Sequence, residues 1–144
     1  MGDARGAGWQ FIGAHPWRME PPGILYCSTR GDVSETDVRQ LLAALTKCSG
    51  PGEPALALIN ISEMGDLSPA ARKAASAPDR QPQAFTTLFV GATFTQRVVI
   101  KLIDKAHHLL ARSPSVAPTL FFDTEEEARA WIAQRWSELP VLQA

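Results

Sequence analysis

A group of small polar side chains follows the most apolar stretch of the chain. The run Pro54–Ile59 is continuously apolar, which is typical of a strand buried on both faces of a parallel sheet. It leads directly into the polar residues Asn60, Ser62, Glu63 and Asp66. A loop at this point would carry hydrogen-bonding side chains from the end of the strand to the start of the next helix. We therefore predict a binding surface in this loop.

Ser68 follows this predicted loop and has two interpretations. It precedes Pro69, and Ser followed by Pro is typical of the N-cap and first position of a helix, where the cap alone contributes roughly 1 kcal/mol. The second interpretation is a phosphorylation site. A phosphate at a helix N-terminus adds about two negative charges where the helix dipole stabilises them. Such a modification would change what this surface binds.

The sequence lacks the common patterns of catalytic and metal sites. His107 and His108 are adjacent, so on a helix they project about 100° apart, unlike the i, i+4 histidines that share a metal ion. His15 is distant from both in sequence. There is no P-loop, Gly-x-Ser-x-Gly elbow or Gly-x-Gly-x-x-Gly fingerprint. We therefore expect a non-enzymatic protein with no metal and no other cofactor.

Composition excludes further classes of partner. The chain has 144 residues and a formal net charge of -1, which gives no electrostatic reason to expect nucleic acid or an anionic membrane as partner. No apolar run approaches the roughly 18 residues of a membrane span, and the first residues lack the apolar centre of a signal peptide. Cys27 and Cys48 have no Cys-x-x-Cys spacing, so we interpret them as buried thiols in a reducing compartment. We expect a cytoplasmic protein.

Strands and helices alternate along most of the chain. Residues 1–8 lack periodicity and are expected to be disordered, residues 9–138 to form one domain, and residues 139–144 to be a tail. Gly31 and Asp32 are expected to break the second strand, and Pro78 to end the second helix. The predicted elements are strands at 10–20, 24–29, 54–59, 84–90 and 119–122, and helices that begin after Ser34, Ser68, Thr93 or Thr95, and Thr124.

This order predicts a single α/β domain with about five strands in a mixed, mostly parallel sheet and four helices. In such sheets, ligands gather beyond the carboxyl ends of the parallel strands, because loops and helix N-termini converge there. The predicted binding rim therefore also includes residues after the fourth strand. These are Thr93, Thr95 and Arg97.

Three passages resemble the bacterial SpoIIAA-like branch of the STAS family, the anti-sigma-factor antagonist fold. They are Gly31–Ser34 (Gly-Asp-Val-Ser), Leu67–Arg72 (Leu-Ser-Pro-Ala-Ala-Arg) and Phe121–Trp131 (Phe-Phe-Asp-Thr-Glu-Glu-Glu-Ala-Arg-Ala-Trp), within a resemblance that spans about residues 17–136. The resemblance implies a protein-binding regulator switched by phosphorylation of a serine ahead of the second helix. Ser68 holds the matching position, although the family's neighbouring serine and glycine are absent and Pro69 follows instead.

The resemblance has a second implication, because the SpoIIAA-like branch is similar in fold to CRAL-TRIO lipid-binding domains. A cleft between the long helix and the sheet would then hold a lipid or another hydrophobic small molecule. Phe94, Val98 and Ile100 lie off the main apolar stripe of that helix, which fits such a cleft. A helix covered on two sides explains them equally well.

Trp9 and Trp17 lie on or before the first strand. Packing of both rings under the last helix explains them. If the first strand is an exposed edge, they would instead mark a partner surface, which leaves homodimerisation open.

Overall fold

The computed structural model describes residues 8–48, 54, 56–77, 85–110 and 119–139, and within them it shows one six-stranded sheet with four α-helices. The strands are β1 (Gln10–Ile12), β2 (His15–Glu20), β3 (Ile24–Val33), β4 (Leu56–Leu67), β5 (Thr86–Val90) and β6 (Thr119–Phe122). The helices are α1 (Glu35–Cys48), α2 (Pro69–Ser76), α3 (Phe94–Leu110) and α4 (Glu125–Arg135), the last followed by a short 3₁₀ turn at Trp136–Glu138.

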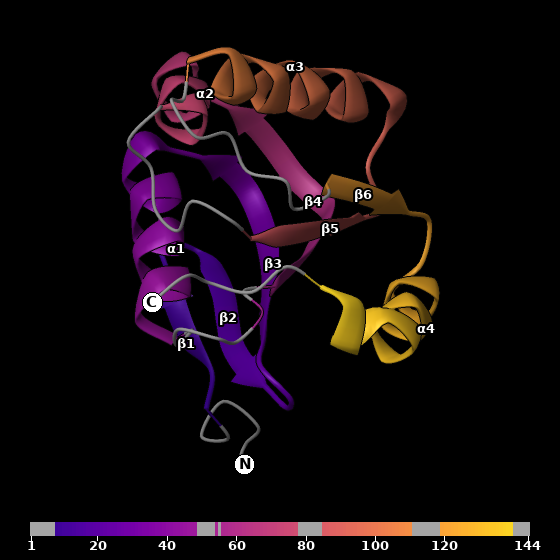
Figure 1. The fold of residues 1–144 in the computed structure, drawn as a ribbon. Coiled ribbons are helices and arrows are strands. Elements are labelled where there is room, and N and C mark those ends of the chain that lie inside the picture. Colours follow the sequence, from indigo (N-terminus) through magenta and orange to yellow (C-terminus); the bar gives the residue numbers. More distant parts are fainter. Residues whose placement is uncertain (1–7, 49–53, 55, 78–84, 111–118, 140–144) are drawn as a thin grey trace.

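The strands lie in the sheet in the order of the sequence, from β1 to β6. β1, β2 and β3 are antiparallel, whereas β3, β4, β5 and β6 are parallel. Because each parallel crossover moves in the same direction and is right-handed, α1, α2 and α3 all cover one face. α4 covers the other face (Figure 1). The predicted single α/β domain with a mixed, mostly parallel sheet is confirmed.

The strand count differs from the prediction because the segment 10–20 forms two strands. A turn at Gly13 and Ala14 separates β1 from β2, and Gly13 has a φ of +59°, a conformation that glycine adopts easily. β1 forms one edge of the sheet, and Phe11 on it is 63% exposed.

The sheet separates two clusters of buried side chains. Trp17 belongs to the cluster on the α1 face, so the expectation that both tryptophans pack under the last helix is wrong for this residue. The α1-side cluster consists of Ile12, Trp17, Leu25, Cys27, Ala44, Leu45, Ala57, Ile59 and Ile61. The α4-side cluster consists of Ile24, Leu56, Leu58, Leu88, Val90, Ala128, Ile132 and Leu139. The central strands β3 and β4 contribute to both clusters, which explains their continuous apolar sequence.

Hydroxyl side chains begin all four helices. Ser34, Ser68 and Thr124 cap α1, α2 and α4 as predicted. For α3, the cap is Thr93, whose Oγ1 accepts from the backbone N–H of Gln96 at 3.1 Å. Thr95 therefore lies inside the helix.

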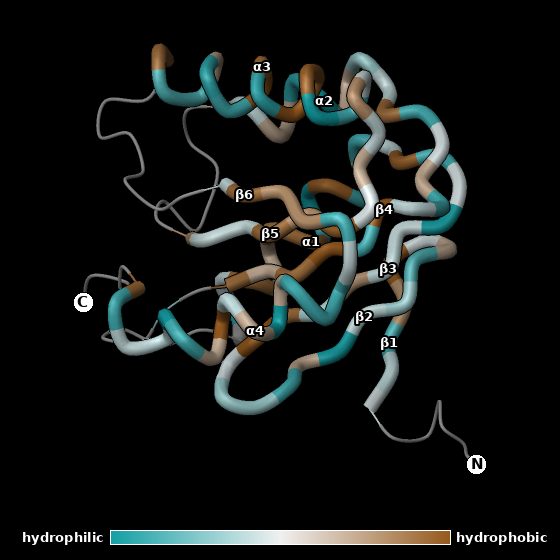
Figure 2. Tube along the Cα trace, turned by 90° about the vertical axis from the view of Figure 1, so that its right-hand side faces the viewer, coloured by the Kyte–Doolittle hydropathy of each residue, from teal (hydrophilic) through white to brown (hydrophobic). Residues whose placement is uncertain are grey.

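The long helix α3 has apolar side chains on two sides, and its hydropathy alternates along the turns (Figure 2). Ile100 lies on the inner side and lines a pocket above the sheet. Phe94 and Val98 are 81% and 40% exposed, so within the described part of the chain the interpretation that a second layer covers them is wrong. α2 lies beside α3 on the same face of the sheet (Figure 1).

Candidate functional site

Ser68 forms the N-cap of α2. Its φ and ψ are -60° and 156°, and its Oγ accepts from the backbone N–H of Ala71 at 3.0 Å. Its own N–H donates to the carbonyl of Val33 at 3.2 Å, which ties the cap to the end of β3. The residue is half-buried. The capping role is therefore confirmed, and phosphorylation stays a prediction.

Arg72 lies on the first turn of α2 beside this cap. Its backbone N–H donates to the carbonyl of Ser68 at 2.9 Å, and its Nε donates to the carbonyl of Leu67 at 3.0 Å. The guanidinium is therefore held close to the Ser68 backbone, at the positive end of a helix dipole. A negative group on the Ser68 hydroxyl would have both a charge partner and the N-terminal end of α2, whose Ala71 N–H already donates to this side chain, within reach.

The polar residues after Asn60 form a strand, so the prediction of a loop here is wrong. β4 continues to Leu67 because β3 also continues, to Val33, with Glu63 opposite Arg30 and Met64 opposite Gly31. Gly31 does not break β3. It has a φ of +77° and lies at one of two register shifts between these strands, where the pairing is displaced but continues. Such bulges bend a strand and re-aim its side chains, and here the pairing of β3 with β4 resumes after each of them.

These polar residues lie on an exposed ridge. Ser62, Glu63 and Asp66 are all exposed. Asn60 Oδ1 accepts from both the N–H and the hydroxyl of Ser62, at 3.0 and 2.7 Å, while the N–H of Asp66 donates to Asp32 at 2.8 Å. We call Asn60, Ser62, Glu63, Asp66 and Ser68 the Ser68 ridge. Its members follow one another along a single strand and its exit.

The other three predicted rim residues lie at the start of α3. Thr93 donates its backbone N–H to Gln96 Oε1 at 2.8 Å in a reciprocal cap, and Thr95 is exposed. Arg97 pairs with Asp123 at 3.1 Å and lies over the Phe121 ring. Gly91 links this group to the ridge, because a Cβ placed on it would lie 2.9 Å from Ser62 Cβ. In the described part of the chain, the hydrogen bonds of Ser68 go to none of these residues.

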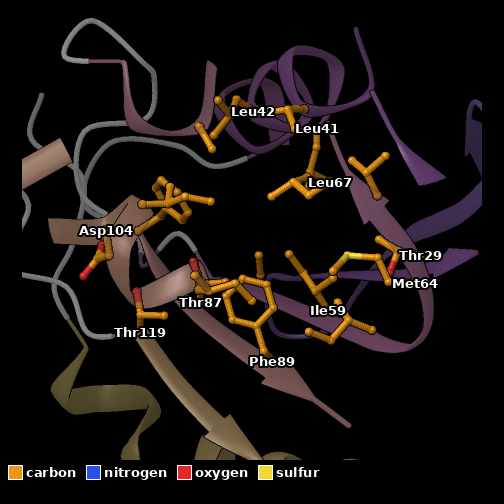
Figure 3. Close-up of a pocket in the computed structure, with 18 of the residues that line it drawn as sticks. Thr29, Leu41, Leu42, Ile59, Met64, Leu67, Thr87, Phe89, Asp104 and Thr119 are labelled. Carbon is orange, nitrogen blue, oxygen red and sulfur yellow. The ribbon is translucent and has the colours of Figure 1, made fainter. Parts of the chain in front are cut away.

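A pocket of about 160 Å³ lies between α1, α2, α3 and the sheet (Figure 3). It occupies the position that the second implication of the resemblance requires. Leu67 and Ala75 form the wall nearest to Ser68, and Val33, whose carbonyl accepts from Ser68, also lines it. Other apolar lining residues come from α1, α3 and the central strands and include Leu41, Leu42, Ile59, Met64, Phe89 and Ile103. The pocket is therefore mainly apolar and adjoins the Ser68 ridge.

His15 connects three elements, a role that its sequence position did not indicate. The ring is 2% exposed. Its Nδ1 accepts from the backbone N–H of Arg30 at 2.8 Å, so its Nε2 carries the proton donated to Asp37 Oδ2 at 3.2 Å. Asp37 also accepts from the backbone N–H of Ser34. The ring thus holds β3 against the start of α1. It does so at Arg30, which is the register partner of Glu63 on the ridge.

The remaining histidines and Cys27 show no arrangement typical of catalysis. His107 is fully buried and its Nδ1 donates to the carbonyl of Ala77 at 2.9 Å, whereas His108 is exposed. Burial, and next the charge of Asp37, raises the pKa of the Cys27 thiol to about 12, as expected of an unreactive cysteine. Among the described residues, no group of three or more His, Cys, Asp or Glu side chains could hold a metal ion. The side chain of Cys48 lies outside the described residues.

A second cluster of charges lies on the opposite face of the sheet, beside α4. Arg129 pairs with Glu20 and with Glu125, both at 2.8 Å, and Arg18 also pairs with Glu20 at 2.9 Å. Tyr26 donates its hydroxyl to Glu125 at 3.0 Å, and burial followed by this carboxylate raises its pKa to about 12. The cluster joins β2 and β3 to α4.

Replacing Glu20 by glutamine is expected to lower the free energy of unfolding by about 1–2 kcal/mol at pH 7. Burial alone raises the pKa of Glu20, but hydrogen bonds and charges from Arg129 and Arg18 outweigh it, so the folded pKa lies below 4.5. The stabilisation is therefore complete above pH 4.5 and is lost as the pH falls through the folded pKa. Urea unfolding from pH 7 to pH 3 should show the stabilities of Glu20→Gln and the unmodified protein converging, while Glu138→Gln, an exposed control outside the first turn of α4, should stay close to the unmodified protein throughout.

Comparisons with known proteins agree with this geometry. The family model described as SpoIIAA-like matches residues 24–133. A solved structure of the anti-sigma factor antagonist SpoIIAA in its unphosphorylated form is similar with a TM-score of 0.56 and 15% sequence identity, over 83% of this chain and 98% of that one. At this identity, the likeness shows the fold. A search of curated proteins finds no match. No helix in the described part of the chain is long and apolar enough to cross a membrane.

Proposed function

The chain belongs to the SpoIIAA-like family, and from this premise we propose that it is a cytoplasmic, non-enzymatic regulator that binds a protein partner through the Ser68 ridge. The observation that carries the proposal is the exposed polar extension of β4, which leads directly into the Ser68 cap beside Arg72. Phosphorylation of Ser68 would replace a neutral cap with a dianion that Arg72 and the N-terminus of α2 can hold. The partner would then meet a different charge at the end of the ridge.

Two substitutions of Ser68 separate partner binding from stability. Ser68→Ala removes the cap and is expected to lower the free energy of unfolding by about 1 kcal/mol, whereas Ser68→Asp keeps a good capping side chain. We expect the opposite order for binding: the alanine variant retains the partner, and the aspartate variant binds it at least about tenfold more weakly. If the less stable variant binds the partner and the more stable one does not, unfolding cannot explain the loss of binding.

The measurement is photo-crosslinking in cells of the natural source. A photoreactive residue at Glu63, on the ridge, is compared with one at Arg39, which is exposed on α1. A discrete crosslinked product from Glu63 alone, lost in Ser68→Asp and kept in Ser68→Ala, is the expected result. Products that form equally from Arg39, or that survive Ser68→Asp unchanged, would contradict the proposal. Mass spectrometry of the same protein then shows directly whether Ser68 carries phosphate.

A second candidate function is the binding of a hydrophobic small molecule, and the pocket beneath α3 is the observation that favours it. Ile103 lines this pocket, whereas Val98 on the same helix is 40% exposed. We expect gently purified protein to show a mass excess in native mass spectrometry that disappears on denaturation. Ile103→Trp, which fills the pocket, should abolish the excess, and the matched variant Val98→Trp should retain it. An excess that persists in Ile103→Trp would place the ligand elsewhere.

A further inference from the structure

The pocket beneath α3 has one polar end. The polar side chains that line it are Thr29, Thr87, Asp104 and Thr119. Thr29 already donates its hydroxyl to the carbonyl of Asn60 at 3.2 Å. Figure 3 shows the other three on the side of the pocket away from Thr29, with Asp104 on α3 and the two threonines on β5 and β6. Thr87 and Thr119 are register partners on these neighbouring parallel strands, so their adjacency follows from the sheet.

Asp104 is the only charged side chain that lines the pocket in the described part of the chain. It is half-buried on α3 and forms no ion pair with any described residue. The nearby Lys101 and Lys105 are exposed, and Lys101 Nζ lies 5.8 Å from the centre of the Phe121 ring. An ionised carboxylate only accepts hydrogen bonds. This end of the pocket therefore offers acceptors and a negative charge.

The size of the pocket limits its occupant. Its volume of about 160 Å³ is close to that of engineered apolar cavities of about 150 Å³ that hold a single benzene ring. A molecule with two long acyl chains would extend well beyond this volume, because drug-sized ligands already occupy pockets of roughly 300–1,000 Å³. The remainder of the lining is aliphatic or aromatic apart from the threonine hydroxyls and the Met64 thioether, which suits one ring or a short alkyl chain.

We infer that this pocket binds a compact primary amine with an apolar body of about one ring, whose ammonium group is held by Asp104 beside the Thr87 and Thr119 hydroxyls. The inference rests on the second candidate function and specifies its ligand class. A charge-assisted hydrogen bond in a partly dehydrated site is stronger than a neutral one. Asp104 therefore selects among apolar molecules of equal size by their charge.

Three probes with similar apolar bodies test this selection. They are 2-phenylethylamine, a cation, propylbenzene, which is neutral, and 3-phenylpropionate, an anion. Titrations are followed by the methyl NMR signals of Ile59, Ile103 and Leu42, which line the pocket, so surface binding is not counted. We expect the amine to bind at least about tenfold more tightly than propylbenzene, and the anion not to bind. Asp104→Asn should remove the preference without weakening propylbenzene, whereas the exposed control Glu126→Gln should change neither.

The outcomes separate this inference from the function on which it rests. If propylbenzene binds in the pocket and the amine binds no better, the pocket is a small-molecule site but the role of Asp104 is wrong. If none of the probes shifts the pocket methyl signals, both the amine inference and the one-ring size limit are wrong. A preference for the amine that persists in Asp104→Asn also overturns the inference. Loss of all binding in Ile103→Trp, with the amine preference intact in Val98→Trp, completes the supporting result.

Discussion

Replacing His15 by alanine is expected to lower the free energy of unfolding by about 3 kcal/mol. The ring is 2% exposed, so its removal leaves a cavity beside the α1-side cluster. The backbone N–H of Arg30 loses its acceptor, and Asp37 loses the donor that Nε2 provides at 3.2 Å. A buried donor left without a partner costs about 1–3 kcal/mol by itself. Urea-induced unfolding at pH 7 measures the change.

Two further variants locate the origin of this effect. His15→Asn places Oδ1 close to the position of Nδ1, so it can still accept from Arg30 but cannot reach Asp37, and an intermediate loss is expected. His108→Ala, an exposed histidine in the same protein, should change stability by less than about 0.5 kcal/mol. If His15→Ala is no more destabilising than His108→Ala, the ring does not hold β3 against α1. Because Arg30 lies opposite Glu63, His15→Ala should also disturb the NMR signals of the Ser68 ridge.

The parts of the fold that the sequence predicted depend on local chemistry. Ser34 and Ser68 cap their helices through hydrogen bonds that reach only three residues ahead, so the pattern of side chains is visible within a short window. Thr124, after which a helix was predicted to begin, forms a reciprocal cap with Glu127 over the same short span. The apolar run before Asn60 likewise indicated a buried strand. In each case, neighbouring residues carry all the necessary information.

The errors arose where distant segments determine the structure. Glu63 and Asp66 have low strand propensity, but β3 pairs with this segment and extends it to Leu67. His15 gains its role from Arg30 and Asp37, which are 15 and 22 residues away. The polar end of the pocket similarly requires α3 to place Asp104 near β5 and β6 (Figure 3). A window that shows only local periodicity cannot contain these contacts.

The Ser68 ridge and the pocket, on which the two candidate functions depend, are adjacent. Leu67 lines the pocket and immediately precedes Ser68, and Ala75 lines it from the helix that Ser68 caps. A ligand in the pocket would therefore touch the residues that position the ridge. In the other direction, a change at Ser68 would have to pass through only one neighbour, Leu67, to reach the pocket. Binding of a small molecule and binding of a protein are thus compatible activities of one fold.

Replacing Gly91 by alanine is expected to lower the free energy of unfolding by about 2–4 kcal/mol and to displace the start of α3 from the ridge. Gly91 has a φ of +79°, where a side chain costs roughly 1–2 kcal/mol. A Cβ there would also lie 2.9 Å from Ser62 Cβ and 3.3 Å from Ser62 Cα. Since the N–H of Gly91 donates to the carbonyl of Phe122 at 3.0 Å, the residue cannot move away from β4 without weakening its bond to β6.

Gly31 provides a matched control for this prediction. Its φ is +77°, but a Cβ on it would have no heavy atom within 4 Å, so Gly31→Ala carries the conformational cost without the collision. We expect a loss of about 1–2 kcal/mol for Gly31→Ala, a larger loss for Gly91→Ala, and shifted NMR signals at Ser62 and Thr93 only in the latter. Equal losses without such shifts would mean that Ser62 yields freely and that close packing at Gly91 does not position the ridge. A larger loss at Gly91 would instead show that this glycine holds the start of α3 against β4, so that the ridge and the cap of α3 form one rigid surface.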